Sequence, residues 1–133
     1  MKEAFQYNII RFQPDTETGE FANIGVVVYA PVAHSLAFRL LTPGQHQRIT
    51  GFFSPLDNSV FQSTLALAQT ELQRVQKLLP KVTNPAGLYE ELIRAREDII
   101  RYAPTGVILG DAPQTSANEL FNRYVERVQP LAA

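Results

Sequence analysis

The chain of 133 residues has no cysteine, no tryptophan and only two histidines. Without cysteine it forms no disulfide, no thiolate zinc site and no thiol redox centre. Net charge is also small, because 12 lysine and arginine residues oppose 13 aspartate and glutamate residues to give a formal charge of −1. This balance provides no overall attraction to nucleic acid or to an anionic membrane, so neither partner is indicated.

Long hydrophobic runs are missing as well. The longest, residues 24–30, has the length of a strand and falls well short of the roughly 20 residues that span a membrane. The first residues lack the apolar core of a secretory signal. Together with the absence of cysteine, these features predict a cytoplasmic protein without membrane attachment. The length and the 45% apolar content predict a single domain over residues 1–133.

The motifs of common catalytic and cofactor-binding sites are absent too. His34 and His46 fall in two different predicted loops, and no paired-histidine or aspartate-rich pattern accompanies them, so we expect no metal site. Neither a glycine-rich phosphate loop nor a G-x-S-x-G nucleophile motif occurs. We therefore predict no cofactor and no catalytic residues, and a binding protein is favoured over an enzyme.

The N-terminal third of the chain has the composition of β-strands, rich in β-branched and aromatic residues. Pro14, Asp15 and Gly19 indicate a turn, and Pro31 begins a second break. The predicted strands span residues 5–13, 21–30 and 36–41.

The remainder of the chain has mainly helical periodicity. Apolar residues recur at three- and four-residue steps over residues 58–79, which predicts a long helix. A second helix is expected from Asn84, a capping residue followed by proline, to about Tyr102. Residues 106–110 have the composition of a fourth strand, and Ser116–Glu119 fits the capping box of a last helix ending near residue 129.

These elements predict an α+β fold. We expect a mainly antiparallel sheet of about four strands with helices packed on one face, in the order βββααβα. Turn lengths decide which side chains share a face, because side chains alternate along a strand. A four-residue first turn and a five-residue second turn collect Phe5, Tyr7, Ile9, Leu36 and Phe38 on one apolar face.

The other predicted face of the sheet mixes amide, guanidinium and aromatic groups: Gln6, Asn8, Ile10, Phe12, Phe21, Asn23, Val27, Tyr29 and Arg39. Such a mixture is typical of an interaction surface, with Asn8 and Tyr29 as candidate binding residues. Alternatively, this face is simply solvated, or the connector of residues 42–56 covers it.

A second group of candidate binding residues flanks the first turn. Arg11, Glu20 and Asn23 lie beside it, with Arg39 on a neighbouring strand. An acid, an amide and two guanidinium groups suit a phosphate or carboxylate ligand. A structural role is the alternative, in which Arg11 and Glu20 form a cross-strand ion pair that steadies the hairpin. Gly25, inside a strand, indicates a bulge or the close approach of another segment.

Two segments, Y-N-I-I-R-F-Q-P from Tyr7 and G-E-F-A-N-I-G-V-V-V from Gly19, resemble the opening of a bacterial domain-of-unknown-function family. The C-terminal strand and helix are also similar to that family. The resemblance implies that Arg11, Glu20, Asn23 and Gly25 belong to a recurring motif, and it implies no activity. Members are similar to small proteins encoded near kinases that resemble the HipA toxin, which implies a regulatory setting.

Three hypotheses follow from the sequence. The first is a non-catalytic binding or regulatory module of a bacterial cytoplasmic system, with a HipA-like kinase as partner. The second is an enzyme on a phosphorylated or nucleic-acid substrate, with Glu20 as base and Arg11 or Arg39 as anion clamp. The third, compatible with both, is a homodimer formed through a sheet edge. We favour the first, because the catalytic motifs are missing.

Overall fold

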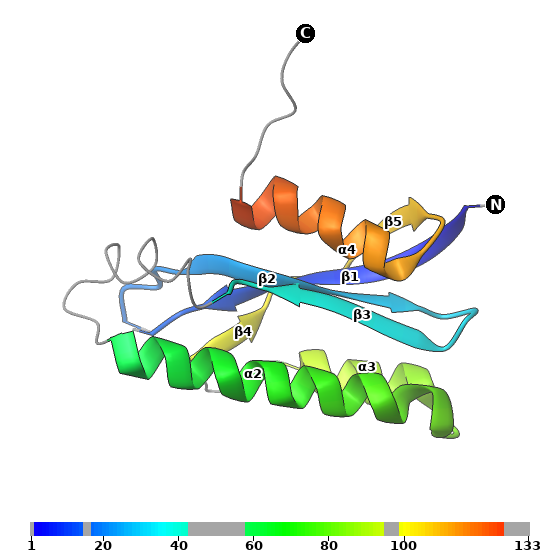
Figure 1. The fold of residues 1–133 in the computed structure, drawn as a ribbon, viewed down its shortest axis with the longest axis horizontal. Helices are drawn as coiled ribbons and strands as arrows, with labels where there is room; N and C mark the ends of the chain where they lie inside the picture. The colour runs from blue at the N-terminus through cyan, green and yellow to red at the C-terminus, as the bar shows by residue number, and fades with distance from the viewer. Residues whose placement is uncertain (1, 15–16, 43–57, 95–98, 127–133) are drawn as a thin grey trace, which may run out of the picture.

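The computed structural model describes residues 2–14, 17–42, 58–94 and 99–126 (Figure 1). Within these ranges the chain forms five antiparallel strands: β1 (Glu3–Phe12), β2 (Ala22–Ala30), β3 (Ser35–Leu40), β4 (Ile100–Tyr102) and β5 (Gly106–Gly110). The helical elements are α2 (Asn58–Leu78), the 3₁₀ turn η2 (Leu79–Lys81), α3 (Pro85–Ile93), α4 (Pro113–Phe121) and the π-helical turn η3 (Asn122–Glu126).

The strands form one sheet, with β1 at its centre. Its order is β3-β2-β1, and both β4 and β5 run along the other side of β1. β5 pairs with the first half of β1, from Glu3 to Tyr7, and β4 pairs with its last three residues. The predicted α+β class and the mainly antiparallel sheet are therefore confirmed.

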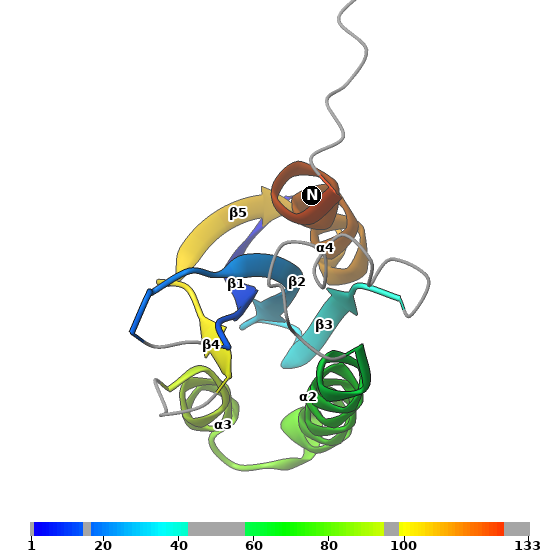
Figure 2. The same cartoon turned by 90° about the vertical axis from the view of Figure 1, so that its left-hand side faces the viewer.

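Helices cover both faces of this sheet. α2 and α3 lie against one face, and α4 with η3 lies against the other (Figures 1 and 2). This corrects the expectation of helices on one face only. The physical reason lies in β2, where residues 24–30 are all buried. A strand that is apolar on both sides needs cover on both sides.

The register of β1 with β2 differs from the predicted one by two residues, and over residues 5–10 the side chains stay on their predicted faces. Tyr7 lies opposite Val28, whereas the predicted four-residue turn would place it opposite Val26. Because side chains alternate with a period of two, a two-residue shift leaves each side chain on its expected face. Between Ile10 and Arg11 the register changes, and this β-bulge reverses the expected face of Asn23.

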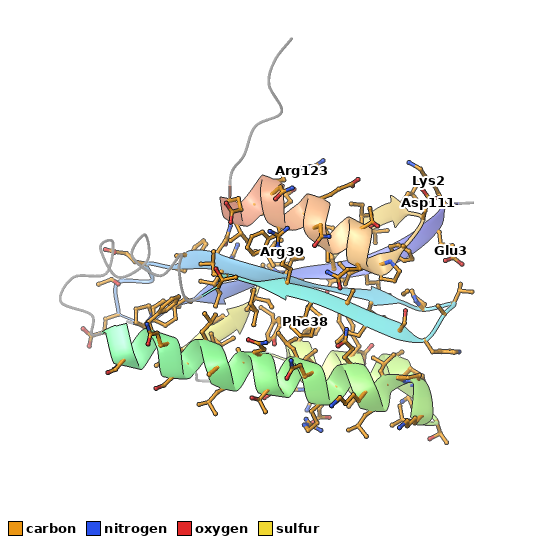
Figure 3. All side chains as sticks on the ribbon, viewed as in Figure 1. Lys2, Glu3, Phe38, Arg39, Asp111 and Arg123 are labelled. Carbon is orange, nitrogen blue, oxygen red and sulfur yellow. The ribbon has the colours of Figure 1, made fainter. Side chains whose placement is uncertain are left out.

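The pairing of β2 with β3 differs by one residue, which has a larger effect. Ala30 pairs with Ser35, so the turn has four residues and not five, and His34 in it has a positive φ of 49°. A one-residue shift moves every β3 side chain to the opposite face. Phe38 thus faces α2, and Arg39 faces α4, as Figure 3 shows.

Two helix boundaries also differ from prediction. The second helix ends at Ile93, and residues 100–102, expected to be helical, form β4 beside β1. The last helix begins at Pro113, so Ser116 is buried inside it and is not its cap. Its expected end near residue 129 lies outside the described residues. In the described part of the chain, none of the helices is long and apolar enough to cross a membrane.

The core has two layers that meet at the sheet. Below it, the apolar stripe of α2 packs as predicted, with Phe61 in edge-on contact with Phe12 at 4.9 Å between ring centroids. Above it, Leu120 and Phe121 of α4 are buried against the strands. Gly25 marks a close approach, since a Cβ there would lie 2.7 Å from the Arg39 carbonyl oxygen.

Candidate functional site

Asn8 and Tyr29, two candidate binding residues, lie inside the protein between the sheet and α3. The Asn8 side chain is 2% exposed, and its amide nitrogen donates to the Ala103 carbonyl at 2.8 Å and to Thr105 Oγ1 at 2.9 Å. The Tyr89 hydroxyl donates to Asn8 Oδ1. All hydrogen-bonding groups of this amide therefore have partners within the fold.

These bonds have a structural consequence for the sheet. The segment between β4 and β5 passes along β1, where the Ala103 N–H donates to the Ile9 carbonyl at 2.8 Å. Asn8 attaches the remainder of that segment to β1 through its side chain. Tyr29 is also buried and stacks on the Tyr89 ring at 4.9 Å. The expectation that this sheet face is an open interaction surface is therefore wrong, and binding by Asn8 or Tyr29 stays a prediction.

Burial also shifts the ionisation of these tyrosines. Desolvation raises the pKa of Tyr89 far above its usual 10.0, with a smaller contribution from Tyr102. Desolvation likewise raises the pKa of Tyr29. Tyr89 therefore stays protonated at neutral pH and keeps the proton that it donates to Asn8.

Arg39 and Arg11 both face the α4 side of the sheet, on strands separated by β2. The Arg39 guanidinium lies 4.2 Å from the centroid of the buried Phe121 ring. The Arg11 guanidinium lies 4.1 Å from the centroid of Phe21, a ring that is 42% exposed. Each arginine thus has its own aromatic partner. Of these two pairs, the one formed by Arg11 has an exposed aromatic ring, Phe21, and the one formed by Arg39 has a buried ring.

Asn23 joins Arg11 because of the β-bulge. The two residues pair across β1 and β2, and Arg101 of β4 pairs with Arg11 from the other side. The Asn23 side-chain nitrogen donates to the Tyr124 carbonyl of η3 at 3.0 Å. Arg11 Nε and Asn23 Oδ1 are both buried and have no hydrogen-bond partner. Two residues paired across β1 and β2 thus leave one buried donor and one buried acceptor unsatisfied, which is rare in folded proteins.

Tyr7 and Tyr124 extend this group along η3. Burial, together with the charge interaction and hydrogen bond with the Tyr124 side chain, raises the pKa of Tyr7, and Arg123 partly opposes this increase. The Tyr7 ring lies over Gly106, where a Cβ would come within 2.5 Å of it. Tyr124 is 36% exposed, and Arg123 is exposed beside it. We call this set the Arg–aromatic cluster: Tyr7, Arg11, Phe21, Asn23, Arg123 and Tyr124.

Glu20 does not join the cluster through Arg11. It is exposed, and its N–H donates to Thr18 Oγ1 at 3.3 Å within the turn. Among the described residues no ion pair connects Glu20 with Arg11, whose guanidinium stacks on Phe21 instead. Of the four residues grouped at the first turn, the structure brings Arg11 and Asn23 into direct pairing.

The sequence reasoning missed Tyr7, Arg123 and Tyr124 as parts of one site. Tyr7 lies in β1 near the start of the chain, and Arg123 and Tyr124 lie in η3 near its end. No local sequence pattern connects two segments so far apart. In the part of the chain that the structure describes, no group of three or more metal-ligating side chains occurs. The chemistry available here is guanidinium and amide hydrogen bonding beside aromatic surface.

The fold and the cluster together define a small α+β protein with helices on both faces of an antiparallel sheet and an arginine–aromatic surface at one end. Comparison with protein families identifies residues 7–125 as a match to DUF3037, a family described as proteins of unknown function. The chain belongs to this family. No curated protein and no solved structure matches the chain. The matched range contains every residue of the Arg–aromatic cluster.

Proposed function

We propose that the chain is a non-catalytic binding module of a bacterial cytoplasmic regulatory system and that the Arg–aromatic cluster binds a protein partner. The observation that carries the proposal is the unsatisfied pair, Arg11 Nε and Asn23 Oδ1. Buried polar groups without partners cost roughly 1–3 kcal/mol each. Unsatisfied buried groups in a folded protein call for an explanation, and a bridging water or a partner that bonds to them on binding supplies one.

The side chains around this pair support a protein partner. Arginine, tyrosine and phenylalanine are enriched at protein interfaces, and the energetic hot spots favour arginine and tyrosine. Phe21 and Tyr124 expose 42% and 36% of their surface, although both are large aromatic residues. They are held in place by the Arg11 stack and by the Asn23 bond to η3. A preordered surface of this kind loses little conformational entropy on binding.

The charge of the cluster indicates what the partner offers. Arg11 and Arg123 contribute two guanidinium groups, and Arg101 lies opposite Arg11 on β4. Guanidinium groups bind carboxylates and phosphates in a bidentate manner. The partner surface that fits is acidic or phosphorylated, with an apolar part for Phe21. A HipA-like kinase encoded nearby is the candidate that the sequence resemblance supports.

The enzymatic alternative, with Glu20 as base and Arg11 or Arg39 as clamp, has weaker geometric support. Glu20 is exposed in the first turn, and Arg39 stacks on Phe121 under α4. A general base acts from hydrogen-bond distance of the reacting group, beside the groups that clamp the substrate. The alternative stays a prediction.

The experiment is co-expression of the chain with the proposed partner, a HipA-like kinase, followed by calorimetric titration of the purified proteins. We expect a one-to-one complex that the double substitution Phe21→Ala, Arg123→Ala weakens by about tenfold or more. The matched control is Leu67→Ala, Arg74→Ala, which removes an exposed apolar residue and an exposed arginine from α2. Absence of a complex, or equal loss of affinity in both variants, would contradict the proposal.

A further inference from the structure

The two edge strands of the sheet differ in whether other elements bond to their outward main-chain groups. At the β3 edge, Gln76 of α2 donates to the Leu36 carbonyl at 2.9 Å, and Gln114 of α4 donates to the Phe38 carbonyl at 3.4 Å. Side chains from two helices therefore occupy two main-chain carbonyl groups of that edge. At the opposite edge, β5 lies at the margin of the sheet with no further strand beside it within the described ranges (Figure 2).

The direction of the β5 main-chain groups follows from the alternation of antiparallel pairs. Ile9 accepts a bond from Ala103, and Gln13 donates to Ile99, so the odd residues of β1 face the β4–β5 side. Phe5 is therefore hydrogen-bonded with its partner Ile108. The N–H and C=O groups of Val107 and Leu109 consequently point away from the sheet. The same alternation predicts the outward carbonyls of Leu36 and Phe38 that the two glutamines contact.

The side chains of the same two residues are exposed. Val107 is 67% exposed and Leu109 is 63% exposed, and both lie on the α2–α3 side of the sheet. The strand Gly106–Gly110 contains no charge, no proline and no bulge, the devices that usually protect a free edge. An unprotected apolar edge strand pairs readily with another strand.

The sequence of β5 indicates which strand that is. G-V-I-L-G has one branched aliphatic residue and one glycine on each side of Ile108, so it is symmetric in residue type. When a second copy pairs antiparallel about that residue, Val107 of each copy lies opposite Leu109 of the other, on the same face. These are the residues with outward main-chain groups, so their pairs are the hydrogen-bonded ones. The nearest acid, Asp111, falls opposite Thr105 of the second copy and meets no like charge.

We propose that two copies of this chain pair through β5, centred on Ile108, to form one continuous sheet across a two-fold axis. The interface is isologous, as expected for a symmetric dimer. It is also small, since five residues of each chain pair, and small interfaces belong to weak or transient complexes. The dimer uses the outward main-chain groups of β5, whereas the Arg–aromatic cluster meets β5 only where the Tyr7 ring lies over Gly106. The two proposals are tested by different substitutions, so either can fail without the other.

The first test measures mass in solution by sedimentation equilibrium up to about 1 mM protein, a range that detects weak association. We expect the wild-type chain to approach the mass of two chains, and Leu109→Lys to reduce association about tenfold or more. Val107→Pro removes one outward N–H and leaves the ladder to β1 intact, and it should act likewise. The control Val32→Lys places the same charge at a residue that is 75% exposed in the β2–β3 turn.

The second test determines the register and uses the absence of cysteine. Oxidation of Ile108→Cys should give a covalent dimer, because the two central residues form a close non-hydrogen-bonded pair. A mixture of Val107→Cys and Leu109→Cys chains should cross-link, whereas Val32→Cys should not. A single-chain mass at every concentration would overturn the proposal. So would dimers that Leu109→Lys and Val107→Pro leave unchanged, or cross-linking of Val32→Cys at the rate of Ile108→Cys.

Discussion

On the sheet face beneath α2 and α3, the buried Asn8 side chain uses both amide hydrogens and its oxygen in bonds within the fold. At one end of the α4 face, Arg11 Nε and Asn23 Oδ1 are buried without partners, beside two exposed aromatic rings. The first region resembles an ordinary protein interior, in which buried polar groups have hydrogen-bond partners. The second has hydrogen-bonding capacity that folding alone does not use. The difference separates polar residues that stabilise the fold from those available for binding.

Substitution of Asn8 should cause the largest loss of stability, because its hydrogen bonds lie in the buried region beneath α2 and α3. Asn8→Ala leaves the Ala103 carbonyl and the Tyr89 hydroxyl buried without their partner. We expect the free energy of unfolding to fall by about 2–4 kcal/mol, measured by urea denaturation. Asn118→Ala, which removes one exposed contact with Gln114, is the control and should cost far less. Equal losses in the two variants would contradict a structural role for Asn8.

Tyr89 tests the same region with a smaller change. Tyr89→Phe keeps the ring and removes one hydrogen bond, so we expect a loss of about 1–2 kcal/mol at neutral pH. Because the pKa of Tyr89 is raised in the folded state, the neutral form is favoured by folding. The contribution of Tyr89 to the free energy of unfolding is fully present below pH 10.0, the pKa of the unfolded state, and is lost as the pH rises above that value. Denaturation between pH 8 and 11 should show a decline in the wild-type chain that is shallower in Tyr89→Phe.

The cluster should show the smallest effect on stability. Phe21 is 42% exposed and contacts Arg11 through one stack. Phe21→Ala should lower the free energy of unfolding by no more than about 1 kcal/mol. Arg123→Ala, at an exposed position, should change it by less than about 0.5 kcal/mol. A loss as large as that of Asn8→Ala would remove the distinction between the two regions.

The sequence was sufficient for elements with strong periodicity or composition. The stripe of α2 and the β-branched runs of β1, β2 and β5 correctly predicted those elements and the α+β class. It was insufficient where a tertiary contact overrides a local pattern. Residues 100–102 continue the apolar spacing of α3, but β1 offers them hydrogen-bond partners, and they form β4.

The faces of the sheet were harder to predict than the strands. One residue in the turn after β2 reversed the side of Phe38 and Arg39, and a bulge reversed that of Asn23. Both are single-residue differences that the hydrophobic pattern tolerates, because β2 is buried on both faces. The Arg–aromatic cluster could not be predicted from local sequence patterns, because Asn23 and Tyr124 are 101 residues apart and come into contact only in the folded chain.

The most direct test is an NMR titration of the isotope-labelled chain with the proposed partner, a HipA-like kinase. We expect amide and side-chain shift changes to gather at the Arg–aromatic cluster, foremost at Phe21, Asn23 and Tyr124. The Asn8 and Tyr89 signals should stay unchanged. Shift changes confined to α2 and α3, with none at the cluster, would contradict this expectation.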